Sequence, residues 1–477
     1  MSKVLGAVLF WLGLVLSSIS SVAQAPCPTA NSTQTTTIPA RSADLICLVP
    51  QVYGGGGLVG TDHGGPLFST AQFSHAAHFS SSAVESFSPL NAEIGTQLSQ
   101  LPLTSPASGF IFSFSPSLGV VTRQTENFGP ILTERADTIG RHKLFFGFSY
   151  QYFNFDKVDG VDLKNLGVVF QHEREPELCK SGSSITCVNG EPVFQQDIIG
   201  TQNRIDLKVH QFTAVGTFGV TDRFDLAVAI PILDVRMAIS SNAVIDSFET
   251  ATDVPHCCVH RFDPANTDAH ENLIGTAHAI FFNNNAASGI GDVILRGKFQ
   301  ALKAEKAGLA LGLDVHLPTG DEQNFLGSGT WGLRPFMTFS YAGRVSPHAS
   351  FGYQRNGDSV LAGDVTTNTS AHLPDIITYS AGADAGITGR FTISADFLGQ
   401  SLVSAKKIAA STFTDAGGAS HPNIVTSTAT INQASITVGG KINPVGKLLV
   451  TANVLFRVND AGLHSKPVPL VGVSYTF

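Results

Sequence analysis

The chain has 477 residues, of which 43% are hydrophobic and only 14% charged, with a formal net charge of −8 at pH 7. Soluble domains carry about 25% charged residues, so the composition disfavours a protein solvated on all sides. The negative charge without a basic run excludes nucleic acid as an expected partner, and the lack of a later run of about 18 apolar residues excludes a membrane domain of helices.

The first 23 residues have the pattern of a cleaved secretory signal peptide. Lys3 gives a positive start, an apolar stretch follows over residues 4–16, and Ser21, Val22 and Ala23 supply the small residues of a cleavage site. The stretch is too short and wrongly flanked for a spanning helix. We therefore expect an exported protein whose mature chain begins after Ala23.

Cysteines fall in three pairs that are close in sequence: Cys27 with Cys47, Cys179 with Cys187, and Cys257 with Cys258. In an oxidising compartment such pairs indicate disulfides, and the first two are our disulfide candidates. The alternative is a metal site with Cys257, Cys258 and His260 as ligands, beside a second cluster of His75 and His78. Adjacent cysteines cannot easily reach one ion, so we expect no metal and no cofactor. Whether Cys257 and Cys258 are bridged stays open.

Residues 24–108 are polar and rich in glycine and serine, with little strand alternation. One helix is predicted, because Ser88 can cap it and Pro89 suits the first helical position. Its apolar stripe comprises Leu90, Ile94, Leu98 and Leu101. A stripe of about three turns must pack on something, and we expect a plug-like segment whose stripe borders a substrate pathway. Whether residues 24–108 fill the lumen or hang in the periplasm stays open.

Residues 109–477 are rich in strands, and the last strand is the most informative. Tyr475 and Phe477 share one face with apolar residues at alternate positions, while small polar residues occupy the other face. Apolar-out and polar-in alternation fits a lipid-facing barrel strand. The terminal aromatic also looks like the assembly signal of bacterial outer-membrane barrels, so we expect recognition by the barrel-assembly machinery.

Connections between the expected strands alternate between short and long. Short turns are expected at 219–223, 303–308, 343–344, 388–390 and 443–447, and long connections at about 116–141, 171–202, 239–289, 318–329, 355–375 and 404–431. Outer-membrane barrels place short turns on the periplasmic side and long loops outside. The predicted fold is therefore all-β: a transmembrane antiparallel outer-membrane barrel of about fourteen strands, where twelve or sixteen stay open.

Charged residues on the inward faces of these hairpins are candidate lumen-lining residues. A turn centred near Glu305 would place Arg296 opposite Asp314. The full set is Arg296, Lys298, Asp314, Asp384, Asp396 and Arg457. Such residues would set the polarity of the lumen.

Several stretches together resemble one known family. They are LPLTSPASGF at 101–110, FGP at 128–130 with ERA at 134–136, GFSYQY at 147–152 with DGVDL at 159–163, GVTDRFDL at 219–226 with IP at 230–231, GIGD at 289–292, and LPTGD at 317–321 with LGSG at 326–329. With them, residues 100–477 are similar to bacterial outer-membrane transporters of the phenol-degradation meta-pathway family, which is related to long-chain fatty-acid (FadL-type) barrels.

The resemblance implies a fourteen-strand barrel with an amino-terminal plug, which passes hydrophobic or aromatic small molecules across the outer membrane. Ligand would enter from the outer loops, occupy an apolar pocket above the plug, and leave sideways or down the lumen. Phe110 and Phe112 join the helix stripe as candidate pathway residues. The front segment is about twice as long as in the fatty-acid transporters and bears cysteines, so their ligand residues cannot be transferred to this chain.

Two other classes stay open. A general diffusion porin or an adhesive surface barrel would have a wide polar lumen or active loops. An outer-membrane enzyme would need serine, histidine and acid on one barrel face near the outer rim, and no nucleophile lies in a recognisable motif. We therefore expect no enzyme.

Overall fold

The computed structural model describes residues 27, 41–54, 79–105, 112–115, 120–123, 127–173, 179, 187–188, 191–248, 260, 262, 266–267, 273–274 and 276–477. The expected signal peptide therefore lies outside the described residues, as do Phe110, Cys257, Cys258, His75 and His78. Within the described parts, no helix is long and apolar enough to span a membrane.

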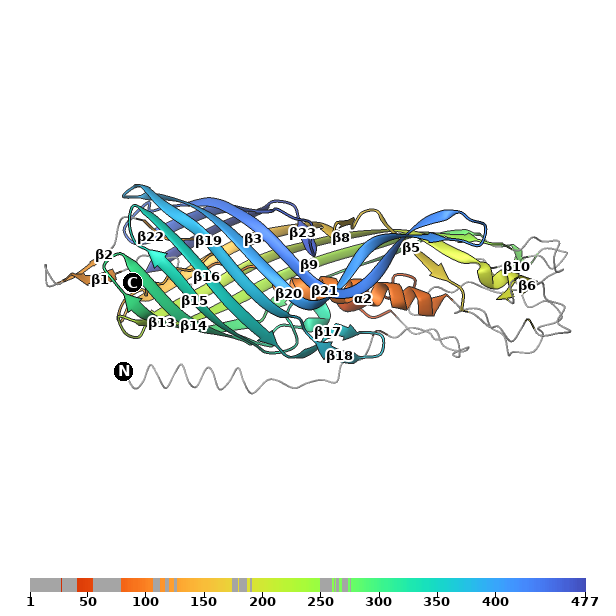
Figure 1. The fold of residues 1–477 in the computed structure, drawn as a ribbon, viewed down its shortest axis with the longest axis horizontal. Helices are drawn as coiled ribbons and strands as arrows, with labels where there is room; N and C mark the ends of the chain where they lie inside the picture. The colour runs from red at the N-terminus through yellow and green to blue at the C-terminus, as the bar shows by residue number, and fades with distance from the viewer. Residues whose placement is uncertain are drawn as a thin grey trace.

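The main sheet is an antiparallel β-barrel that closes on itself (Figure 1). Its ring consists of β3 (Leu144–Val158), β8 (Ile198–Gly219), β9 (Phe224–Asp246), β13 (Val293–Lys303), β14 (Ala307–Leu317), β15 (Gly332–Tyr341), β16 (Val345–Asn356), β19 (Asp375–Thr388), β20 (Phe391–Thr414), β21 (Ser420–Ile442), β22 (Leu448–Arg457) and β24 (Val468–Thr476). Consecutive members pair, and the carboxy-terminal β24 closes the ring on β3. The predicted antiparallel barrel is confirmed.

Four further strands extend this sheet outside the ring: β4 (Val161–Asp162), β5 (Leu166–Gln171), β12 (His278–Ile290) and β23 (Leu463–Ser465). The remaining strands form separate pairs: β1 (Phe112–Ser115) with β2 (Val120–Arg123), β6 (Cys187–Val188) with β7 (Glu191–Pro192), β10 (Asn266–Thr267) with β11 (Leu273–Ile274), and β17 (Asp358–Asp364) with β18 (Thr369–His372). Short 3-10 helices are η1 (Leu45–Cys47), η4 (Val193–Gln196) and η5 (Glu322–Asn324).

Among the described residues the ring has twelve strands, fewer than the count of about fourteen. The difference comes from the start of the expected barrel at residue 109. There, β1 and β2 pair only with each other, and the first ring strand begins at Leu144. Strands of four residues show too little apolar and polar alternation for the sequence to specify whether they belong to the barrel wall.

Side chains alternate across the wall as the sequence predicted. On β14, Leu311 and Leu313 are 48% and 45% exposed on the outside, whereas Asp314 is fully buried inside. The predicted register with Arg296 opposite Asp314 is confirmed. Apolar residues on the outside suit a hydrocarbon environment, because in water they would form a continuous exposed belt.

One end of the barrel collects every short turn that the sequence predicted. The pairs β8–β9, β13–β14, β15–β16, β19–β20 and β21–β22 are joined there. The start of β3 and the end of β24 lie at this end too, because the Phe477 amide donates to the Leu144 carbonyl. In the orientation of outer-membrane barrels this is the periplasmic end, and we call the opposite end the outer end.

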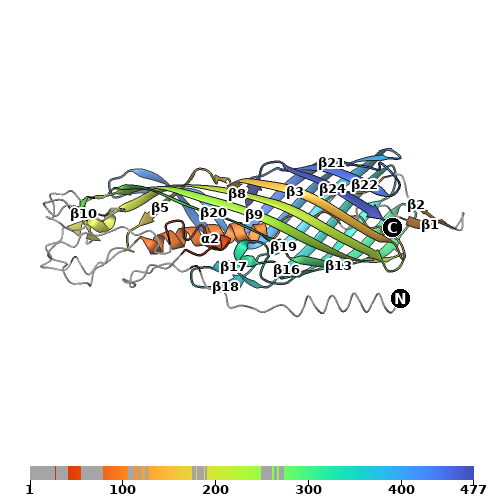
Figure 2. The same ribbon diagram turned by 180° about the vertical axis from the view of Figure 1, so that it is seen from behind.

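Strands β8, β9, β20 and β21 are 22 to 24 residues long. At about 3.3 Å per residue they run for roughly 70–80 Å, well beyond an apolar band about 25 Å tall. They form an extension of the barrel at its outer end (Figures 1 and 2). The expected long loop at 404–431 is therefore mostly strand. Its serines and threonines lack apolar alternation, so the sequence pattern did not indicate strands there.

The extension holds the single long helix of the described residues, α2 (Ser80–Leu98), which packs on β20, β21, β5 and β17 (Figure 2). The helix begins eight residues before the expected cap Ser88, and Pro89 lies inside it. Phe87, one turn upstream of Leu90, is buried in the same core. This packing favours continuation of the helix through Pro89 despite the unfavourable local propensity.

Candidate functional site

A cavity of about 300 Å³ lies inside the barrel, between the carboxy-terminal end of α2 and an inner segment near residue 133. Its apolar lining includes Leu98, Leu101, Leu103, Leu132, Phe153, Phe155, Leu233, Ile294, Leu326, Phe336, Ile376, Leu398, Leu455 and Leu463. Its charged or histidine lining consists of Glu134, Asp292, Arg296, His316, Arg334 and Arg457. A mainly apolar pocket with a few converging polar groups is the usual form of a small-molecule site.

The outer side of the cavity is bordered by a glutamine network that ties α2 to the barrel wall. Gln97 Nε2 donates to Glu93 Oε1 at 3.1 Å, and Gln433 Nε2 on β21 donates to Gln97 Oε1. The Ile408 amide on β20 donates to Glu93 Oε2 at 3.1 Å. Gly462 (φ 63°) lies against Gln97 and Gln433, and a Cβ there would collide with both. These contacts hold the end of the helix in one position.

Glu93 is 2% exposed, and its environment favours the neutral carboxyl. Burial, followed by the charge of Asp159, raises the pKa of Glu93 to about 10. At neutral pH a proton-bearing side chain, rather than an anion, therefore lies next to Gln97, which lines the cavity.

The periplasmic side is closed by residues 127–140, which we call the inner segment. Two buried lysines bind its carbonyl groups. Lys441 Nζ donates to Phe128 O at 3.1 Å and to Pro130 O at 2.5 Å. Lys298 Nζ donates to Arg135 O at 3.2 Å and Asp137 O at 2.8 Å, and binds Glu134 Oε1 at 3.1 Å.

Acids and hydroxyls of the wall bind the inner segment as well. Asp225 accepts from the Ile139 amide at 3.0 Å, and Thr392 Oγ1 accepts from the Phe128 amide at 3.0 Å. Thr133 Oγ1 donates to Asp396 Oδ1 at 3.1 Å and lies 2.8 Å from His348 Nε2. The prediction of an outer loop at 116–141 is wrong for residues 127–140, because these residues lie within the barrel. Backbone without secondary structure needs such partners when it is buried.

An ion network lies between the inner segment and the cavity. Arg296 binds Asp314 through two nitrogens at 2.6 and 2.8 Å, and it also contacts Glu134. Arg334 binds the same carboxylate, with its Nε 3.0 Å from Asp314 Oδ2. The Arg296 guanidinium lies 4.8 Å from the ring centre of Phe336. Buried charges are tolerated when each has such partners.

Two resemblance motifs, GIGD and LPTGD with LGSG, bind each other where β12 passes into β13. Asp292 accepts from the Gly320 amide at 3.1 Å and from the Ser328 amide at 2.7 Å. The Val293 amide donates to Thr319 Oγ1 at 2.9 Å. These bonds hold Leu326 close to Gly289 and Gly291, so this side chain covers the strand break from the cavity side.

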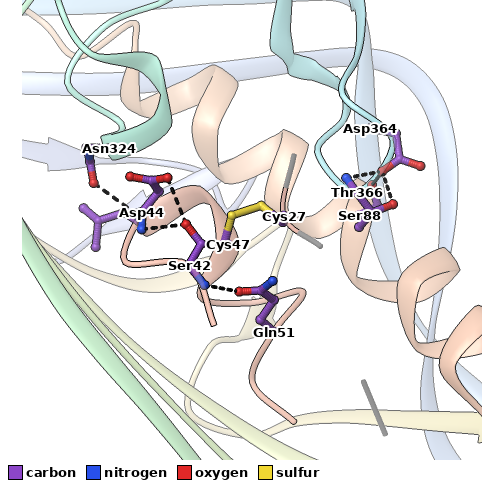
Figure 3. The surroundings of a disulfide bond; sticks show 10 residues. Cys27, Ser42, Asp44, Cys47, Gln51, Ser88, Asn324, Asp364 and Thr366 are labelled. Carbon is purple, nitrogen blue, oxygen red and sulfur yellow. Dashed lines mark hydrogen bonds between the residues drawn. A yellow bond between two sulfur atoms is a disulfide. The ribbon is translucent and has the colours of Figure 1, made fainter. Parts of the chain in front are cut away.

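A disulfide joins Cys27 to Cys47 and fastens the front segment to the outer loops (Figure 3). The Cys27 amide donates to Val365 O at 2.8 Å, and the Leu45 amide donates to Asn324 Oδ1 at 3.2 Å. A second disulfide joins Cys179 to Cys187. Residues 41–54 are therefore attached above the cavity, whereas residues 101–105 run along its lining to the inner segment, where the Ser105 amide donates to Ile131 O at 3.0 Å.

Only some of the expected pathway residues line the cavity. Leu98 and Leu101 line the cavity, although Leu101 lies beyond the end of α2, whereas Leu90 and Ile94 are buried in the core of the extension. Phe112 lies in β1, away from the ring.

The expected lumen residues also divide into two groups. Arg296 and Arg457 line the cavity. The others, Lys298, Asp314, Asp384 and Asp396, are 0 to 3% exposed and belong to the networks beneath it. In the last strand, Tyr475 and Phe477 are exposed on the outer surface of the barrel.

Sequence reasoning did not name Glu134, His348, Arg334 and Lys441 as site residues. Two observations together could have identified Glu134. It lies in the ERA motif, which with FGP belongs to the resemblance, and both motifs lie in a stretch without the alternation of a barrel strand. The alternation of β21 also places Lys441 inward, at a position where an unpartnered cation would be unfavourable.

Comparisons with known proteins agree with the motifs. A family model described as "Putative MetA-pathway of phenol degradation" matches residues 192–403. None of the curated proteins matches the chain. Among solved structures, an outer membrane channel from Pseudomonas putida F1 is 10% identical with a TM-score of 0.39, over 72% of this chain and 98% of that one.

Two further structures show similarity at the same low level. A FadL homologue from Pseudomonas aeruginosa is 12% identical with a TM-score of 0.31, over 70% of this chain and 90% of that one. The toluene transporter TbuX of Ralstonia pickettii is 9% identical with a TM-score of 0.26, over 71% and 90%. At these scores the similarities bear on neither substrate nor mechanism. The resemblance to the phenol-degradation meta-pathway family, which the motifs indicated, is confirmed by the family match over residues 192–403.

Proposed function

We propose that the protein is an outer-membrane channel for the passive uptake of small hydrophobic or aromatic molecules. The observation that carries this proposal is the cavity of about 300 Å³, which has a mostly apolar lining and lies between the end of α2 and the inner segment. An apolar solute gains free energy from such a surface, whereas an open water-filled pore offers it none.

The outer belt of apolar side chains supports a place in a membrane. Phe146, Phe148 and Phe351 are about half exposed on this belt. The signal peptide over residues 1–23 would direct export, outer-membrane lipid would cover the belt, and the last strand with Phe477 would be recognised by the barrel-assembly machinery.

In this proposal, transport needs two movements. Ligand enters past the end of α2 when the Gln97 contacts open. It leaves either downward, when the inner segment is displaced, or sideways past Leu326 at the strand break. The proposed plug therefore has two parts: residues 41–54 and α2 of the segment 24–108 close the outer end, and residues 127–140 close the periplasmic end.

Uptake of a radiolabelled neutral aromatic hydrocarbon by cells that lack their own channel tests the proposal. Cells carrying the protein should take up the compound faster, and with saturation. Leu398→Asp puts a charge on the cavity lining and should abolish the gain, whereas Thr412→Asp puts the same charge at an exposed position of β20 in the extension, away from the cavity, and should keep it. Planar-bilayer recordings complete the test. A large steady conductance from the full mature protein would contradict the proposal and favour a water-filled porin.

A further inference from the structure

The three arginines that line the cavity differ in how their charges are compensated. Arg296 and Arg334 share the buried carboxylate of Asp314, and Arg296 also contacts Glu134. Arg457, at the outer end of β22, has no carboxylate within ion-pair distance among the described residues. Asp460 acts on it only from farther away, and this acid is bound to Lys157 at 2.8 Å.

The Arg457 side chain keeps donors for a further partner. Its Nη1 donates to Gln433 Oε1 at 3.2 Å and its Nη2 to Ala461 O at 2.7 Å. Its Nε is buried and donates to no acceptor in the described parts of the chain. A guanidinium has five N–H donors, and Nη1 and Nη2 each carry a second N–H beyond the two bonds above, so these two nitrogens can still bind a carboxylate.

The network next to Arg457 supplies hydrogen-bond partners but no countercharge. Gln433 connects Arg457 to Gln97, and Gln97 connects to Glu93. With its pKa raised to about 10 by burial, Glu93 is neutral at physiological pH. Arg457 is half-buried, and the acid that acts on it, Asp460, is already bound to Lys157, so its charge is only weakly compensated and the cavity favours an anionic guest at this point.

Apolar side chains line the same part of the cavity as Arg457. Leu455 precedes it by two residues on the same face of β22, and Leu463, Phe153 and Phe155 line the cavity as well. All four belong to one buried apolar cluster. The cavity volume lies at the lower end of the range for ligand pockets, about 300 to 1,000 Å³, which limits the size of a guest.

We propose that the cavity binds small amphipathic monocarboxylates, with the carboxylate on Arg457 and the apolar body against Leu455, Leu463, Phe153 and Phe155. The inference rests on the proposed uptake function and narrows its substrate class from hydrophobic molecules in general to apolar molecules with one acidic head. Arg457 is thus a specificity-determining residue.

Calorimetric titration of the protein in lipid nanodiscs tests the inference with two probes of one shape, 4-phenylbutyrate and its neutral amide. The acid should bind at least tenfold more tightly than the amide, because a hydrogen bond to a charged group is worth more than one to a neutral group. Arg457→Gln should remove this preference and leave the affinity for the amide within threefold. Arg355→Gln removes an exposed arginine that does not line the cavity, and should keep the preference.

Each outcome is decisive. Equal binding of acid and amide by the unchanged protein overturns the carboxylate inference but leaves the proposed uptake function standing, and this comparison needs no variant to fold. A preference that survives in Arg457→Gln also overturns it. Binding of neither probe, with heat released only as in empty nanodiscs, contradicts the inference and the proposed function together.

Discussion

Lys298 should hold the inner segment closed, and its replacement by methionine should open the channel. Its side chain is 2% exposed, and its ammonium binds Glu134, Arg135 O and Asp137 O within 3.2 Å. Methionine has no donor for the carbonyls of Arg135 and Asp137 or for the Glu134 carboxylate. Removing one partner of a buried ion pair costs roughly 3–5 kcal/mol. With about 1.4 kcal/mol per factor of ten, the ratio of closed to open segment should fall by about two to three and a half powers of ten.

Open probability in single-channel recordings measures this ratio directly. Lys298→Met should show frequent openings at neutral pH where the unchanged protein shows few. Lys303→Met is the matched control, because Lys303 ends the same strand but is exposed and should leave the record unchanged. If Lys298→Met opens no more than twice as often as the unchanged protein, the inner segment is not held by this lysine and the reasoning is wrong.

Three further perturbations act on the outer closure. Gly462→Ala forces a Cβ into Gln97 at a left-handed backbone position, so α2 should be cleaved faster by protease, with docking weakened by about 1–3 kcal/mol. Since burial raises the pKa of Glu93 to about 10 from about 4.3 in the unfolded chain, docking of α2 should weaken as pH rises from 5 to 8, and Glu93→Gln should flatten this slope in denaturant titrations of a labelled helix. An unchanged slope in that variant would rule out Glu93 as its source. Reduction of the bridge between Cys27 and Cys47, 20 residues apart, should loosen residues 41–54 by about 3 kcal/mol, seen as faster proteolysis there, and equal rates with and without reductant would contradict this.

The sequence determined the features of this protein that depend on local pattern. Apolar and polar residues alternate with a period of two, so the faces of β13, β14, β21 and β24 follow from the chain itself. The short turns follow in the same way, because they interrupt that alternation over a few residues. The opposition of Arg296 and Asp314 needed only a hairpin register.

Only the tertiary structure decided what closes the barrel. Residues 127–140 have no periodicity of their own, and their partners Lys298, His348 and Lys441 come from three strands that are distant in sequence. The same holds for α2, which continues through Pro89 because residues on both sides of it are buried against the extension. Local pattern specifies which side of a strand faces lipid, whereas the position of an irregular segment depends on partners that only the closed barrel brings together.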